Sequence, residues 1–228
     1  THAFFKALLF LSAGSIILGL ERGHHHLAHG KHVEGHEEIF DPNDMRNMGG
    51  LRKRMPVTFW VYMAGVLALA GIFPFAGFWS KDEILLDALK NYPVVFILLI
   101  LAAFLTAFYM GRQVWMVFFG KPRHAAADHA VESPGIITVP LMLLAGLSLV
   151  GGILNLPGIH TLSNWLGHTI EAPEHEAVLA PWLALSWDGF NPIVALLALV
   201  LALIAIYLAW LIYGHKPLET GQKDPLKR

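Results

Sequence analysis

Lys6 is a charged residue inside an otherwise apolar stretch, HAFFKALLFL, and it is the first candidate for chemistry. His2 stands four residues before it, on the same face of a helix. A charge at the centre of a membrane helix costs about 2.5–3.5 kcal/mol, and burial disfavours the charged form of lysine, so both protonation states become accessible. His2 and Lys6 are therefore candidates for proton transfer. The alternative is a lysine that snorkels to the helix end.

Lys81 is the second candidate, because it follows a predicted helix break in the segment FPFAGFWSKDEI. Pro74 lacks a backbone N–H, and Gly77 loosens the chain nearby. The break frees carbonyls of the first half-helix and N–H groups of the second, which could solvate Lys81 at mid-depth. Asp82 and Glu83 suit the positive end of a second half-helix. Their carboxylates could also modulate the pKa of Lys81. The alternative is a plain interfacial helix cap.

Other polar residues carry weaker signals. Arg112 lies near the basic end of an apolar block, which favours a membrane anchor. The His-rich stretch 24–36 has spacings that could bind a metal on a helix, but its glycines favour a solvated loop. The chain has no cysteine, which excludes disulfides and cysteine-held iron–sulfur clusters from it. Its formal net charge of −1 gives no sign of nucleic-acid binding.

The elements that must position these residues are membrane helices. Hydrophobic residues make up 55% of the chain and charged residues 14%, whereas globular chains hold about 45–50% and about 25%. The sequence predicts an all-α, polytopic transmembrane bundle in the lipid bilayer, with one discontinuous helix. Its expected segments are a transmembrane helix over 1–20, a cytoplasmic loop over 21–55, a discontinuous transmembrane helix over 56–90, transmembrane helices over 92–120 and 136–157, an outer loop over 158–190, a transmembrane helix over 191–214 and a cytoplasmic tail over 215–228.

The second apolar block is too long for one straight crossing and too short for two. Residues 57–90 would form a helix of about 51 Å at 1.5 Å per residue, against about 30 Å of hydrocarbon. We expect half-helices over 57–72 and 79–90, with a break at 73–78. Such breaks persist in membranes only inside protein or beside water. The alternative is a hairpin of two short helices.

The basic residues favour the broken helix. With five crossings, twelve of the 16 Lys and Arg residues fall on one side, in 21–55, 121–135 and 215–228, and only Lys90 falls on the other. The side rich in Lys and Arg is normally cytoplasmic. The first residue is not Met and lies inside an apolar run, so we expect an internal fragment of a longer chain.

Three segments carry a resemblance to a known family. They are THAFFKALLFLSAGS at 1–15, DMRNMGGLRKRMPVTFW at 44–60 and LAGIFPFAGFWSKDEIL at 69–85. The chain resembles the C-terminal part of the NADH–quinone oxidoreductase subunit L or chain 5 family, the antiporter-like membrane subunits of respiratory complex I. The family usually has Pro-Pro where this chain has Phe73-Pro74.

The resemblance implies a multi-pass protein of the inner (plasma) membrane that moves protons in response to quinone reduction elsewhere. Inverted five-helix repeats are implied, of which this chain would hold part. In this family, residues matching His2 and Lys6 belong to a central hydrophilic axis, and one matching Lys81 lies at the broken helix. NAD, FMN, iron–sulfur clusters and quinone are expected on partner subunits, with no redox or metal site here. The neighbouring partner would be another antiporter-like subunit.

Two other functions compete with this one. A subunit of a multisubunit Na⁺/H⁺ antiporter looks similar around the first and second segments, although the forms THAFFKALLFLSAGS and GFWSKDEIL favour complex I. A structural membrane scaffold would need no ion path, and the lysines Lys6 and Lys81 argue against it.

Overall fold

Every regular element in the described part of the chain is helical, which confirms the predicted all-α class. The computed structural model describes residues 2–30, 40–155 and 190–226, apart from 216, 220, 221 and 223. The elements are α1 (His2–Gly30), η1 (Met45–Asn47), α2 (Leu51–Arg54), α3 (Pro56–Ala70), α4 (Ala76–Asn91), α5 (Pro93–Phe118), α6 (Ala125–Asp128), α7 (Gly135–Val150), η2 (Gly151–Asn155), α9 (Pro192–Ala209) and η4 (Trp210–Gly214), the last a π-helical turn.

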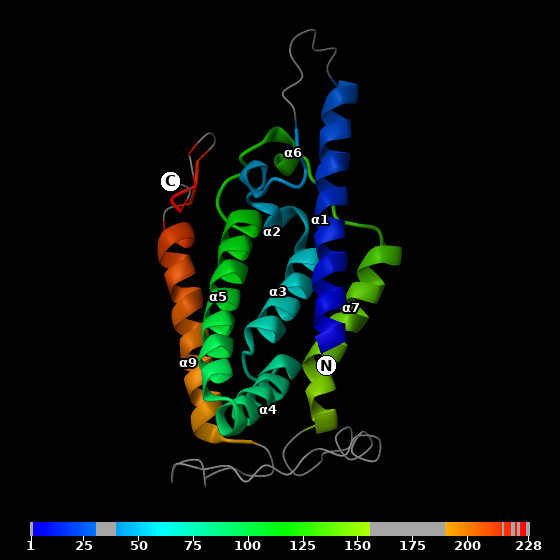
Figure 1. The fold of residues 1–228 in the computed structure, drawn as a ribbon. Coiled ribbons are helices and arrows are strands. Elements are labelled where there is room, and N and C mark those ends of the chain that lie inside the picture. Colours follow the sequence, from blue (N-terminus) through cyan, green and yellow to red (C-terminus); the bar gives the residue numbers. More distant parts are fainter. Residues whose placement is uncertain are drawn as a thin grey trace.

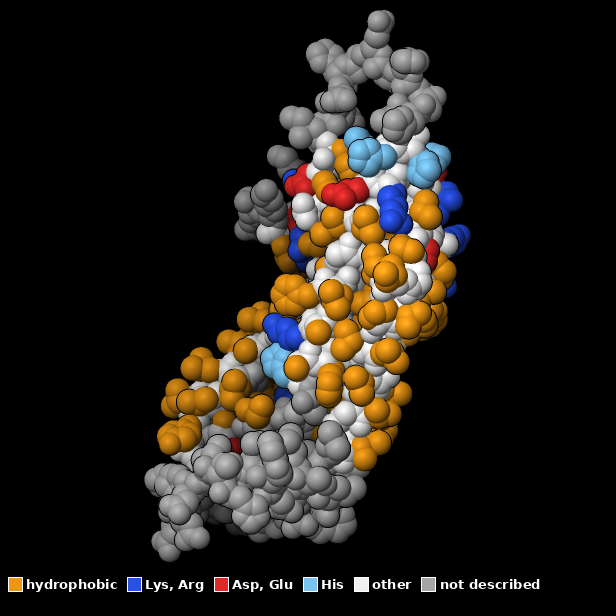
Figure 2. All heavy atoms as spheres, turned by 90° about the vertical axis from the view of Figure 1, so that its right-hand side faces the viewer, with side chains coloured by type: hydrophobic (Ala, Val, Ile, Leu, Met, Phe, Trp, Pro, Cys, Tyr) orange, Lys and Arg blue, Asp and Glu red, His pale blue; other side chains and the backbone are white. Residues whose placement is uncertain are grey.

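The long helices run side by side, and the short ones lie at the ends of the bundle (Figure 1). Helix α1 packs on α3 and α7, and α5 packs on α9. The stretches His2–Leu27, Pro93–Phe118, Gly135–Ile153 and Pro192–Gly214 are each long and apolar enough to cross a membrane. Figure 2 shows most charged side chains of one face gathered toward one end, above a broad hydrophobic band that itself holds a basic side chain. This division suits a bundle whose sides face lipid.

Two boundaries differ from the expected ones. Helix α1 continues to Gly30 instead of ending at residue 20, because a helix can project beyond the apolar stretch. Gly23 lets it do so against α6, where a Cβ would overlap the Ala126 carbonyl oxygen. The last apolar block before the outer loop ends in a 3₁₀ turn, Gly151–Asn155, in place of α-helix. Residues 31–39 and most of the expected outer loop, 156–189, lie outside the described residues.

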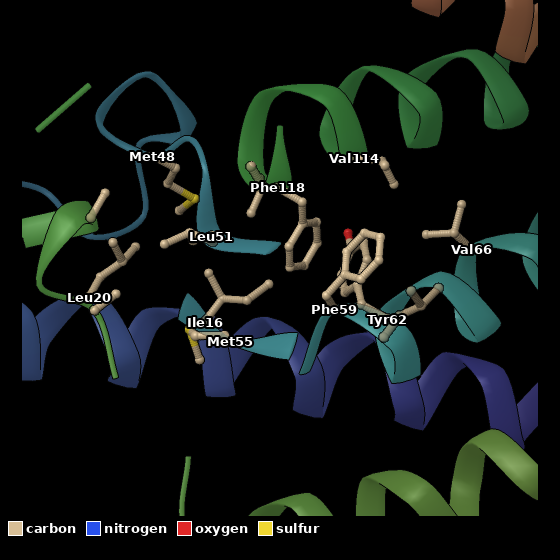
Figure 3. Packing of buried hydrophobic residues seen from close by; sticks show 14 of the residues in the cluster. Ile16, Leu20, Met48, Leu51, Met55, Phe59, Tyr62, Val66, Val114 and Phe118 are labelled. Carbon is tan, nitrogen blue, oxygen red and sulfur yellow. The ribbon is translucent and has the colours of Figure 1, made fainter. Parts of the chain in front are cut away.

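The largest buried cluster joins α1, α3 and α5 near the end of the bundle that carries α2 (Figure 3). Phe59 and Tyr62 of α3 contact Phe118 of α5, with ring centroids 5.2 and 5.3 Å apart. Ile16 and Leu20 of α1 complete the cluster. Lipid tails are as apolar as these side chains, so the hydrophobic effect does not drive helices together within a membrane. Close van der Waals packing of this kind holds them together instead.

The predicted helix break is present, about three residues earlier than expected. Helix α3 ends at Ala70, and Gly71 follows in the left-handed region with φ +76°. The N–H groups of Gly71 and Ile72 donate to the carbonyls of Ala68 and Leu67, at 3.1 and 2.9 Å. This is a Schellman-type end, which satisfies carbonyls that the helix cannot.

The two half-helices together make one discontinuous element. Helix α3 has 15 residues and α4 has 16, or about 22 and 24 Å, each shorter than the hydrocarbon core. Helix α4 lies obliquely at the far end from α2, and α5 returns from it (Figure 1). Pro74 lies inside the break, and Gly77 lies in the first turn of α4, directly on the Ala68 carbonyl.

Three sequence-distant basic segments meet at the α2 end of the bundle. The Gly50 N–H donates to the Phe119 carbonyl at 3.1 Å. The Arg123 guanidinium donates to the carbonyls of Arg46, Met45 and Met116, and residues 120–123 share a cavity of about 480 Å³ with 217–219. Burial lowers the pKa of Arg123, and the three carbonyls stabilise its guanidinium by accepting hydrogen bonds.

We expect Gly77→Ala to destabilise the protein by about 1–3 kcal/mol, the scale of overpacking a fitted contact. The new Cβ would overlap the Ala68 carbonyl oxygen, and neither backbone can move freely. Thermal unfolding of the purified protein measures the effect. Gly146→Ala is the matched control, since its Cβ would meet nothing within 4 Å. Equal stability of the two variants would show that the α3–α4 contact is loose.

Candidate functional site

Lys81 reaches back across the break to the end of α3. Its Nζ donates to the Leu69 carbonyl at 3.0 Å, and its aliphatic stem lies against Gly71, where a Cβ would come within 3.2 Å of it. The Schellman-type turn already satisfies the carbonyls of Leu67 and Ala68, so Lys81 takes the next carbonyl along. A cation is also favoured at the negative end of a helix.

Lys81 and His2 line the same cavity, of about 410 Å³. The cavity lies between the start of α1, the end of α3, the body of α4 and the middle of α5. Most of its wall is apolar, and its polar side chains are His2, Ser80, Lys81 and Thr106. The structure therefore brings together two of the three predicted proton-path residues, although 79 positions separate them in the sequence.

Lys6, which the sequence analysis placed in the interior of the membrane, lies on the surface of the described part of this chain. Lys6 and His2 are both exposed; the Lys6 Nζ lies 5.9 Å from the Phe10 ring centroid, and the His2 ring stacks on Phe5 at 5.0 Å. Lys6 does not line the cavity around Lys81. Figure 2 shows basic and His side chains lying together at the surface within the hydrophobic band.

Asp82 faces away from Lys81, toward the start of α9. Its Oδ2 accepts from the Asn191 N–H at 3.2 Å, while the Asn191 side chain caps α9 by accepting from the N–H groups of Ile193 and Val194. Asp82 Oδ1 and Asn191 Nδ2 are buried without a partner in the described structure. Through this hydrogen bond Asp82 anchors α4 to the start of α9.

Neither acidic residue lies where the sequence placed it. Asp82 and Glu83 were expected at the start of the second half-helix, but α4 begins at Ala76 and has no acidic residue in its first turn. Glu83 is exposed. The half-helix starts three residues earlier than expected because Ala76 and Gly77 pack tightly against the end of α3.

Arg112, expected to be a membrane anchor, forms a specific contact between elements. Its guanidinium pairs with Asp224 and donates to the Tyr213 hydroxyl at 3.2 Å. Tyr213 in turn donates to Asp224 at 2.8 Å. Burial alone would raise the pKa of Asp224, but hydrogen bonds from the Leu226 N–H, Arg112 and Tyr213 outweigh it and lower that pKa. The tail is thereby fixed to α5.

Glu132 is a structural residue that the sequence analysis missed. Its carboxylate accepts from the N–H groups of Val57 and Thr58, at 2.8 and 3.2 Å, and from the Thr58 hydroxyl at 2.6 Å. Thr58 and Ser15 hydroxyls lie 2.9 Å apart, and Ser15 donates to Ser133 at 2.7 Å. Glu132 thus supplies the N-terminal cap that Met55 cannot give to α3.

The described part of the His-rich stretch forms no metal site. His24 stacks on Phe40 with centroids 4.9 Å apart, and its ring lies 6.3 Å from that of His124. Among the described residues, no group of three or more His, Cys, Asp or Glu side chains could hold a metal ion. The stretch 31–36 lies outside these residues.

The described helices form a bundle with a lysine at an internal helix break. Residues 1–106 match the family model described as NADH:quinone oxidoreductase/Mrp antiporter, transmembrane. The chain is a membrane protein by its four long apolar helices, and it is similar to this family over the segment that holds His2, Lys6 and Lys81.

Curated relatives extend the similarity to nearly the whole chain. NAD(P)H-quinone oxidoreductase chain 5 of Picosynechococcus sp. is 37% identical over 99% of this chain and 35% of its own length. NADH-quinone oxidoreductase subunit L of Mycobacterium tuberculosis is 37% identical over 96% of this chain and 30% of its length. The subunit L of Rickettsia bellii is 44% identical over 68% of this chain and 21% of its length. The chain spans about a third of the length of the chain 5 relatives it matches.

We expect Glu132→Ala to destabilise the protein by about 1–3 kcal/mol, because it leaves buried donors at the start of α3 without an acceptor. Glu21→Ala is the control, since Glu21 is exposed on α1 at the same end of the bundle. Thermal unfolding of both variants gives the comparison. A Glu132→Ala protein as stable as the control would mean that water caps α3 equally well.

Proposed function

We propose that this chain is part of a proton-translocating membrane subunit of NADH–quinone oxidoreductase, complex I, in the inner (plasma) membrane. The proposal rests chiefly on Lys81, which bridges the helix break and shares a cavity with His2. The names of the relatives support membership in a quinone oxidoreductase. The family description also includes Mrp antiporters, but the subunit L and chain 5 relatives favour complex I.

The proposed proton path runs through His2, Lys6 and Lys81. A protonated lysine offers three donors, of which one goes to the Leu69 carbonyl, and the cavity leaves room for water at the others. When Lys81 loses its proton, the amine can accept another from water on the cavity side. Lys6 lies one helical turn from His2, so it would extend the path onto the outer face of α1.

The outer face of α1 is then an interface within the longer protein. A charge there is costly against lipid, so we infer that protein covers Lys6 in the assembled subunit. Other complex I subunits, among them a neighbouring antiporter-like subunit, are the proposed partners. NAD, FMN, iron–sulfur clusters and quinone would bind to those partners, and quinone reduction there would drive proton movement here.

The α2 end of the bundle is proposed to face the cytoplasm, because it holds the basic segments. The chain contains no native cysteine, so single cysteines can report the topology. We expect an impermeant maleimide to label Asn43→Cys from the cytoplasmic side only and Tyr92→Cys from the opposite side only; both residues are exposed. Labelling of both from one side would overturn the single crossing by α3 and α4.

The proposed function is tested at Lys81. We expect Lys81→Met to slow proton transfer through the site by about 100-fold or more, the scale of losing one acid–base group. Lys81→Glu should retain more transfer, because a carboxyl group still takes up and releases a proton and holds water. The measurement is proton translocation in membrane vesicles, divided by the amount of assembled complex.

Lys90→Met is the matched control, because Lys90 lies on the same helix and does not line the cavity. Electron transfer to an artificial acceptor should stay normal in all three variants. Wild-type proton translocation in Lys81→Met would show that Lys81 only caps α3 and that protons take another route.

A further inference from the structure

A cavity of about 640 Å³ lies at the α2 end of the bundle, away from the proton-path residues. We call it the basic cavity, defined by the cations Arg52, Lys53, Arg54 and Lys121, the rings of Phe118 and Phe119, and Asp128. Three cations, Arg52, Lys53 and Arg54, come from α2, and the fourth, Lys121, comes from the loop after α5. The proposed proton path does not use any of them.

Glycines bring these two segments together. Gly49, Gly50 and Gly120 have φ of +126°, +69° and +77°, in the region that side chains rarely adopt. A Cβ at Gly49 would overlap the Lys121 carbonyl oxygen, and one at Gly50 would lie 3.1 Å from the Pro122 ring. The close approach that places Lys121 beside α2 therefore depends on these glycines.

The basic cavity holds a surplus of positive charge. Arg54 pairs with Asp128 at 2.8 Å, and this contact lowers the pKa of Asp128. Across the described residues, no ion pair joins Arg52, Lys53 or Lys121 to an acidic side chain. Four cations and one carboxylate thus leave three uncompensated positive charges around one cavity.

Arg52 lies against two aromatic rings, those of Phe59 and Phe119. Its guanidinium carbon lies 5.4 Å from the Phe119 ring centroid and 5.7 Å from that of Phe59, within the range of cation–π attraction. These contacts hold the guanidinium beside the two rings, and its N–H edge makes no hydrogen bond to another described residue. That edge matches the oxygens of a phosphate group in a bidentate contact.

The position of the cavity favours a lipid over a soluble anion. Phe118 is the last residue of a candidate membrane span, and α3 enters the bundle beside it. Trp60, in the first turns of α3, is 70% exposed, as is usual for tryptophan at a membrane–water boundary. Basic pockets at this level of a membrane protein suit anionic headgroups.

We propose that the basic cavity binds the phosphate group of an anionic phospholipid. The phosphate lies among Arg52, Lys53 and Lys121, and the acyl chains run down past the aromatic rings along the outside of the bundle. This site is independent of proton transfer, so its failure would leave the proposed function untouched.

A photoactivatable phosphatidylglycerol tests the site in the assembled complex, reconstituted in phosphatidylcholine vesicles. We expect cross-links on peptides covering 50–55 and 118–122, and few with a photoactivatable phosphatidylcholine. The double variant Lys53→Gln, Lys121→Gln should reduce the yield by about tenfold or more, because it removes two of the cations that attract an anionic headgroup.

Arg22→Gln with Arg46→Gln is the matched control, since it removes two charges at the same end but outside the cavity. Its cross-link yield should equal that of the wild type. Equal labelling by the two lipids in the wild-type complex would overturn the proposal without any variant. So would an unchanged yield in the Lys53, Lys121 variant, or competition by excess inorganic phosphate, which would indicate a soluble anion.

Discussion

Backbone groups released by a helix break inside a membrane must find partners in the protein, and the bond from Lys81 Nζ to the Leu69 carbonyl meets this requirement here. The bond that satisfies the free Leu69 carbonyl also holds an ionisable group, the Lys81 amine, at the wall of a cavity. A break closed by backbone contacts alone would leave no place for a charge at this depth. One hydrogen bond therefore both satisfies the carbonyl at the end of α3 and positions the lysine.

The rest of the bundle holds the two half-helices in the relation that this bond needs. Glu132 fixes the start of α3, and Asp82 ties α4 to the start of α9. Between them, Gly77 lets α4 approach the Ala68 carbonyl. The start of α3 and the first half of α4 are therefore restrained, and the two half-helices are in contact at the break. A small movement of α4 would alter the Lys81–Leu69 distance directly, which would couple the proposed proton transfer to conformation.

Local signals in the sequence predicted the break but not its partners. Pro74 and the neighbouring glycines mark a helix interruption in any surroundings, and the length of 57–90 excludes one straight crossing. The cap from Glu132 could not be predicted, since 75 residues separate it from Val57. The apolar neighbours of Lys6 did not predict which side of α1 faces the rest of this chain. That side depends on contacts between distant segments, and Lys6 lies on the surface.

The central claim is that Lys81 meets water inside the membrane, and an electron cryomicroscopy structure of the intact complex that shows ordered water tests it most directly. The cavity lined by His2, Ser80, Lys81 and Thr106 is the place to look. We predict ordered water bonded to the Lys81 Nζ and reaching toward His2, with the bond to the Leu69 carbonyl kept. A cavity filled by lipid tails or apolar side chains, with no water at Lys81, would contradict the account.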